Sequence, residues 1–116
     1  MPTTGPNLGL THGYVLGESG WHTGMETNLK RLDALVHLAV LDRDLTTPPS
    51  SPTDGDRYII PSGATGAWAG KTNQVAVRIN GAWEYYAPKV GWLAYVIDED
   101  KLVVYKATGW SAGVAI

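Results

Sequence analysis

Hydrophobic and polar positions change their period once along the chain. In "WHTGMETNLKRLDALVHLAVLDRD" (residues 21–44) apolar side chains recur every three or four residues, whereas after residue 56 they occur in short runs that alternate with polar residues. The first period is typical of a helix and the second of β-strands. The sequence therefore predicts an α+β fold in which one amphipathic helix is followed by a small all-β unit.

The helix is expected from about Gly24 to about Leu41, because Thr23 precedes Glu26 by the three residues of a capping box. Its apolar positions are spaced by 4, 3, 4 and 3 residues, the alternation of a coiled coil, and they form the predicted oligomer interface: Met25, Leu29, Leu32, Val36 and Ala39. The alternative is that this helix packs on the β unit of its own chain. The C-terminal half is typical of a helix buried among several neighbours, because it is apolar on nearly every side through Leu35, Leu38, Val40 and Leu41.

The segments on either side of the helix are rich in glycine and proline. Residues 1–20 contain five Gly and two Pro without a sustained period, which indicates an extended arm with at most a short strand around residues 14–16. The stretch "TTPPSSPTDGD" contains three Pro residues and predicts a stiff linker. We therefore expect an attachment arm and oligomerisation helix at 1–47, a Pro-rich linker at 48–56 and a β domain at 57–116.

The β domain is predicted as a meander or small barrel of about five or six strands, from the runs "RYIIP", "QVAVRI", "AWEYYAP", "WLAYVI" and "LVVYKA". Asn80-Gly81 is the strongest signal for a hairpin with a type I′ turn, and residues 98–101 are expected to close a second hairpin. Successive residues of a strand point to opposite faces, and every residue of "WLAYVI" is apolar or aromatic. Both faces of this strand are therefore expected to be buried, either in a closed barrel or against a neighbouring subunit.

Gly and Trp occur together three times, at residues 66–68, 81–83 and 108–110. We interpret the repeat as structural first, with Trp83 lying across its hairpin opposite Val77 or Ile79. The chain has five Trp and six Tyr but no Phe, which suits surfaces that are apolar on one side and polar on the other. The residues expected to contact a subunit or a ligand are Trp83, Tyr85, Tyr86, Trp92 and Tyr95. Stacking of such side chains on sugar rings is the alternative to subunit contact.

Composition excludes several classes of protein. The net charge is −2 and the nine Lys and Arg residues do not cluster, so no nucleic-acid partner is expected. No apolar run approaches the ~18 residues of a membrane span, and we expect no membrane insertion. The absence of cysteine removes disulfides and thiolate metal sites.

Catalytic patterns are also lacking. The three histidines lie in the arm and the helix, and the acidic groups at residues 42–44, 54–56 and 98–100 lack the ligand spacing of a dedicated calcium loop. We therefore expect that the protein is not an enzyme, and we assign no catalytic, cofactor-binding or metal-binding residue. A hydrolase acting through these loop acids is a further alternative.

Five stretches form a distinctive set: "SGWHTGMETNLKRLD", "VLDRDLTTPP", "SPTDGDRYI", "GATGAWAG" and "NGAWEYYAPKVGWLAYVIDED". Together they resemble a family of unknown-function domains in bacteriophage tail fibre, tail spike and head fibre proteins and in head spikes of gene transfer agents. The resemblance covers nearly the whole chain. It implies a structural virion protein made in the host cytoplasm and assigns no catalytic residue.

The resemblance and the apolar helix together predict a symmetric homo-oligomer in a fibre or spike, with a trimer favoured and a pentamer as the other expectation. The chain stops shortly after Trp110, where a fibre would continue, and this favours a base, an adaptor or a short spike. Its other expected partners are virion proteins at a capsid vertex, a tail or a fibre. The alternative function is carbohydrate binding by the β domain in recognition of the host surface.

Overall fold

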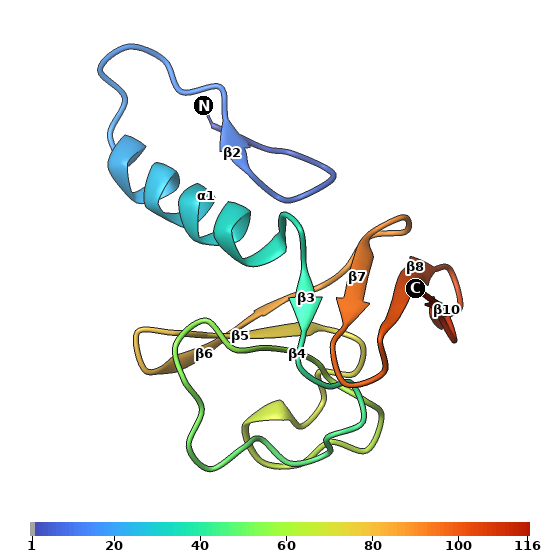
Figure 1. The fold of residues 1–116 in the computed structure, drawn as a ribbon. Helices are drawn as coiled ribbons and strands as arrows, with labels where there is room; N and C mark the ends of the chain where they lie inside the picture. Colours follow the sequence, from blue (N-terminus) through green and yellow to red (C-terminus); the bar gives the residue numbers. More distant parts are fainter. Residues whose placement is uncertain (1) are drawn as a thin grey trace. The chain divides into compact units, whose positions relative to one another are not determined.

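A computed structural model describes residues 2–116 and divides the chain into two compact units, the first ending at Val36 and the second beginning at His37 (Figure 1). Within the described residues there are one α-helix and about ten strands in three sheets, none of them closed into a barrel. The α+β class is confirmed, and the expectation of a closed barrel is not met. The helical elements are α1 (Trp21–Leu35) and the short 3-10 helix η1 (Gly66–Trp68).

The strands are short, and several contain only two residues. In chain order they are β1 (Thr3–Thr4), β2 (Thr11–His12), β3 (Ala39–Val40), β4 (Arg57–Ile59), β5 (Val75–Ile79), β6 (Ala82–Tyr86), β7 (Leu93–Val96), β8 (Lys101–Lys106), β9 (Gly109–Trp110) and β10 (Val114–Ala115).

The first unit contains a hairpin that the sequence did not indicate. β1 and β2 pair antiparallel, with Thr4 opposite Thr11, whereas residues 14–16 form no strand. The ring of Tyr14 lies over Gly24 of α1 and leaves no room there for a Cβ atom. The predicted extended arm is therefore wrong, because residues 2–14 fold back on the helix.

The helix ends earlier than the periodicity predicts. Val36 is its C-cap with an extended backbone, and His37 follows with a positive φ of 54°. Ala39 lies in β3, so the predicted interface positions Val36 and Ala39 are not helical and the heptad alternation stops after Leu32. The physical reason is tertiary pairing: β3 forms a parallel ladder with residues 95–96 of β7, which overrides the local period.

The start of the helix also differs from the prediction. Gly20, with a left-handed backbone, is the N-cap and no side chain caps the helix. Thr23 lies inside the first turn, so the expected capping box with Glu26 is wrong. No helix in the described part of the chain combines the length and the apolar character needed to cross a membrane.

The second unit contains two sheets that meet at β3 and β4. One has the order β4-β5-β6 and is antiparallel; the other has the order β10-β8-β7-β3, with β9 paired to β8. The amide of Leu41 donates to the Arg57 carbonyl (2.8 Å) and that of Ile59 to the Asp42 carbonyl (3.2 Å), which joins the sheets. The strands exceed the predicted five or six because β3, β9 and β10 are too short to show alternation.

Both predicted hairpins are confirmed. Asn80 (φ 50°) and Gly81 (φ 77°) form the turn between Ile79 and Ala82, which are paired. Residues 97–100 connect the paired residues Val96 and Lys101. Since the two-residue turn fixes the register, Trp83 lies opposite Arg78 and not opposite Val77 or Ile79 as expected.

The Gly-Trp repeats build the core beside the three-stranded sheet. Trp68 is completely buried, and its ring packs 5.2 Å from that of Trp83 and 5.3 Å from that of Tyr58 (centroid distances). The guanidinium of Arg78 covers the Trp83 ring from 5.3 Å. The structural interpretation of the repeat at residues 66–68 and 81–83 is therefore confirmed.

The Pro-rich segment 48–56 belongs to the second unit. The Thr65 amide donates to the Thr46 carbonyl (2.8 Å) just before this segment, and the Gly55 amide donates to the Arg78 carbonyl (2.8 Å) at its end. The compact units divide at Val36 and not at residues 48–56, because β3 and the residues after it complete the sheets of the second unit.

Candidate functional site

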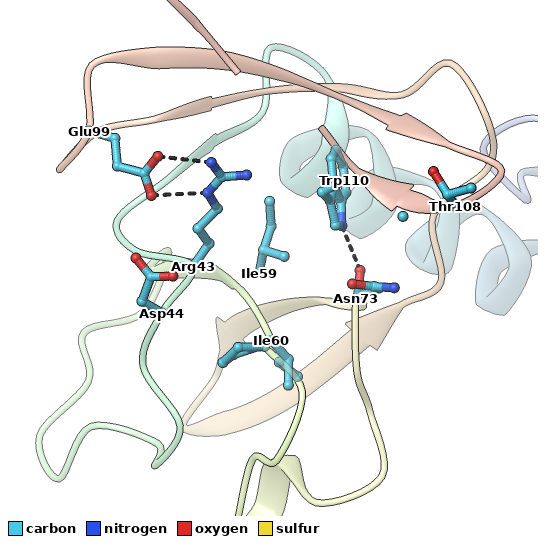
Figure 2. A pocket seen from close by; sticks show the side chains of 10 residues that line it. Arg43, Asp44, Ile59, Ile60, Asn73, Glu99, Thr108 and Trp110 are labelled. Atoms are coloured by element: carbon cyan, nitrogen blue, oxygen red, sulfur yellow. Dashed lines mark hydrogen bonds and ion pairs between the residues drawn. The ribbon is translucent and has the colours of Figure 1, made fainter. Parts of the chain in front are cut away.

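The second unit contains a cavity of about 480 Å³ on which five segments of the chain converge (Figure 2). Charged side chains line one side, Trp110 and Thr108 the other, and Ile59 and Ile60 lie between them. The complete lining is Arg43, Asp44, Ile59, Ile60, Pro61, Asn73, Glu99, Thr108, Gly109 and Trp110.

Arg43 and Glu99 form a bidentate ion pair on the charged side of the cavity. Arg43 Nε lies 3.0 Å from one carboxylate oxygen and Nη2 lies 2.9 Å from the other. The guanidinium also donates to the carbonyls of Ser111 (2.7 Å) and Ala112 (2.8 Å). Hydrogen bonding to Arg43 lowers the pKa of Glu99, and the same bond raises the pKa of Arg43. Arg43 thus joins its own segment to those of Glu99 and of Ser111 and Ala112 beside the cavity.

Asn73 and Trp110 form the opposite side. The indole nitrogen of Trp110 donates to the Asn73 carbonyl (2.9 Å), and the Asn73 amide donates to the Ile60 carbonyl (2.8 Å). These bonds hold Asn73 at a positive φ of 71°, which Asn tolerates better than most residues. Tyr105 packs edge-on against Trp110 with ring centroids 5.2 Å apart. The Asn73 backbone and the Trp110 ring are therefore fixed in place.

Three carboxylates gather next to the cavity. Oxygens of Asp42, Asp44 and Asp98 lie within 4.8 Å of one another. Partial burial, followed by the charges of Asp42 and Glu99, raises the pKa of Asp98. One carboxylate oxygen of Asp42 accepts a hydrogen bond from the backbone amide of Asp44 (2.6 Å). The structure thus joins two of the acidic groups that the sequence analysis considered separately, and such groups are common at protein surfaces without a cation.

The groups around the cavity are of kinds that bind polar ligands. An indole beside amide, hydroxyl and carboxylate groups offers an apolar surface and several hydrogen-bonding partners to a small polar ligand. Glu99 is a poor general acid, because its ion pair with Arg43 keeps its pKa low. Among the residues that line the cavity there is no histidine or cysteine.

The five aromatic residues predicted to contact a ligand or subunit do not line this cavity. Tyr86 is buried, and Trp83 belongs to the core described above. Tyr85 donates its hydroxyl to the Ala67 carbonyl (2.8 Å), and burial raises its pKa. Trp92 precedes β7 and is half-buried.

Tyr95 and its neighbours show that one face of β7 is exposed within this chain. Tyr95 lies in β7 with its hydroxyl bonded to Asp100, while the neighbouring Ala94 and Val96 are buried. Leu93, on the same side as Tyr95, is 56% exposed. Nothing in the second unit covers the side of Leu93, so the strand is not buried in a closed barrel, and its burial against a neighbouring subunit stays a prediction.

The predicted helix interface is apolar and exposed. Leu29, Leu32 and Val36 are 55%, 37% and 44% exposed, and Trp21 joins them at 56%. With 3.6 residues per turn, Trp21, Met25, Leu29 and Leu32 fall on one face of α1, and Val36 follows as its C-cap. Met25 itself is half-buried and accepts a weak hydrogen bond from Asn28 at its sulfur (3.8 Å).

Sequence reasoning missed Arg43, Glu99 and Asn73 as site residues. A faint signal existed, since Arg43 lies between two aspartates and Glu99 between two others. Their pairing depends on the parallel contact between β3 and β7, for which the sequence gives no local indication.

Residues 25–111 match the profile of the family DUF2793, described as a protein of unknown function, and the chain belongs to this family. The match begins within α1 and includes every residue that lines the cavity. A search of the curated proteins finds no match.

Proposed function

We propose that this protein is a structural virion protein, a base, adaptor or short spike of a phage or phage-like particle, that assembles as a symmetric homo-oligomer. The five sequence stretches described above support the virion assignment by resemblance. The observation that carries the oligomer is the row of exposed apolar side chains along α1, formed by Trp21, Leu29 and Leu32 and followed by the exposed C-cap Val36.

Exposing this row of apolar side chains to water is unfavourable. Burying one large apolar side chain contributes about 1.5–3 kcal/mol, so a helix that exposes several on one face gains substantially from association. The charged side chains of Glu26 and Asp33 border this row, and the opposite side of α1 carries the exposed polar residues Thr23 and Thr27, which suits the solvent side of a helical bundle. We favour a trimer around this helix, with a pentamer as the alternative, docked on a capsid vertex, tail or fibre protein.

The helix interface is tested by sedimentation of the full chain. Replacing Leu29 and Leu32 together by Asp places two charges in the proposed interface and is expected to reduce the mass of the oligomer. The control replaces Thr23 and Thr27 by Asp, because both lie exposed on the opposite face and receive the same charge. If both variants keep the native mass, α1 is not the assembly element.

Carbohydrate binding is the second candidate, and the cavity beside Trp110 favours it. A sugar could place its apolar face near the indole while Asn73 and Asp44 accept or donate hydrogen bonds. Calorimetry with host-surface polysaccharide fragments would test it. Binding should be lost in Trp110→Ala and kept in Tyr85→Phe, whose ring lies outside the cavity. Absence of heat at millimolar sugar would rule against this function.

A further inference from the structure

The sheet β10-β8-β7 has an apolar outer face. Strand register places Leu93 opposite Val104, Tyr95 opposite Leu102, and Leu102 opposite Val114. Residues directly opposite one another in a sheet project to the same side. These five side chains therefore share one face, which we call the outer face.

The outer face is exposed, although the sheet already contributes its other side to the core. Ala94, Val96 and Val103 on the inner side are almost completely buried. On the outer face Leu102 is 38% exposed and Val114 is 69% exposed. A sheet with two apolar faces normally has both of them covered. An exposed apolar face of this kind marks a site where another molecule binds.

Charge is distributed unequally along this face. At one end, Asp100 accepts the hydroxyl of Tyr95 and so lies at the margin of the face. At the other end, Lys106 continues the alternation of Leu102 and Val104 and is exposed. The centre of the face contains no charged side chain, so one end is acidic and the other basic.

We propose that the outer face binds a second copy of this chain, sheet against sheet, across a twofold axis that sets the two β8 strands antiparallel. An uncharged centre can face its own copy without repulsion. The antiparallel arrangement places Asp100 of each copy near Lys106 of the other, whereas a parallel one would place like charges together. This contact goes beyond the proposed function, because it does not involve α1.

Two packed sheets lie about 10 Å apart with their apolar side chains interdigitated. Three short strands offer less surface than the roughly 800 Å² per partner of a standard interface, so the contact is expected to depend on protein concentration. The charges at the ends mainly fix the orientation.

The experiment uses the full chain carrying Leu29→Asp and Leu32→Asp, so that association through the helix is removed. Sedimentation equilibrium of this variant should show a monomer–dimer equilibrium. Adding Leu102→Thr and Val114→Thr, which preserve a preference for strands, should weaken the dimer by about tenfold or more. Near-ultraviolet circular dichroism checks that each variant is folded.

The orientation is tested by charge changes in the same background. Lys106→Glu should weaken the dimer, because the introduced carboxylate would face Asp100 of the other copy. Adding Asp100→Asn, which suits the positive φ of that position, should recover part of the affinity. A helix variant that is monomeric at every concentration, or a dimer unaffected by the two Thr substitutions, would overturn the proposal. Failure to recover affinity would overturn the antiparallel arrangement. The wild-type mass separately tests the helix interface.

Discussion

The side-chain amide of Asn28 hydrogen-bonds both backbone groups of Thr11: its oxygen accepts the Thr11 amide (2.7 Å) and its nitrogen donates to the Thr11 carbonyl (2.8 Å). Asn28 is 7% exposed and is the one buried polar side chain among the described residues. A single side chain on α1 thus continues the hydrogen bonding of β2. The N-terminal arm is a folded part of the first unit for this reason.

We expect Asn28→Asp to destabilise the first unit by about 1–3 kcal/mol, the usual cost of an unsatisfied buried polar group. Aspartate can still accept the Thr11 amide, but it has no donor for the Thr11 carbonyl. Hydrogen exchange of the residues in β1 and β2 should accelerate, while that of β5 should not change. Thr27→Ala, an exposed neighbour, is the control. Equal protection in all three proteins would show that the amide does not hold the hairpin.

The ion pair of Arg43 and Glu99 should make stability depend on acid. The pKa of Glu99 is lowered in the folded state, so its contribution is fully present above the ordinary glutamate pKa of about 4.3 and is lost as pH falls through the lower folded value. Glu99→Gln should therefore lower the melting temperature at pH 7. Near pH 3 the difference in melting temperature between this variant and the wild type should be smaller. A difference that is constant with pH would contradict this role.

The turn at Asn80-Gly81 depends on glycine. Gly81 has a φ of 77° with no atom near its missing Cβ, so substitutions there act through the backbone alone. Gly81→Val is expected to cost more than about 1 kcal/mol, because β-branched residues avoid this conformation. Gly81→Asn should cost less, since Asn tolerates a positive φ. Denaturant unfolding measures both, and equal midpoints would show that the turn is not strained.

Two truncations distinguish the observed unit boundary from the Pro-rich segment. A fragment of residues 37–116 keeps β3 and Arg43 and is expected to fold. A fragment of residues 48–116 lacks both, loses the parallel pairing with β7 and exposes the buried Val96. We expect the shorter fragment to unfold at a clearly lower temperature or to aggregate. Two fragments of equal stability would place the boundary in the Pro-rich segment after all.

Local patterns in the sequence predicted local structure well. The turn at Asn80-Gly81 needs only two residues with positive φ, and the helix needs only its period, so both could be recognised. The end of the helix could not, because residues 36–39 continue the apolar period and it is the pairing of β3 with β7 that removes them from it. Wherever distant segments compete with a local preference, the preference alone gives the wrong boundary.

The candidate site was less predictable for the same reason. Arg43 and Glu99 each look like ordinary loop residues, and only the fold brings them into contact. The aromatic residues were easier to notice, but their chemistry does not reveal whether they face the core or a partner: Trp68 and Trp83 pack inward, and Trp110 lines the cavity.

The connection of Arg43 to Ser111, 68 residues later in the chain, has a consequence for synthesis. The hydrogen bonds that join the N-terminal hairpin to α1, such as those between Thr11 and Asn28, lie within the first unit, so this unit can fold as soon as Val36 has left the ribosome. The second unit cannot close until nearly all of its residues have emerged, because β3 waits for β7 and Arg43 waits for Glu99 and Ser111. During that interval β4, β5 and β6 are translated with one neighbouring sheet still missing. Newly made chains are then most vulnerable to aggregation, and slower translation beyond residue 86 would prolong that stage.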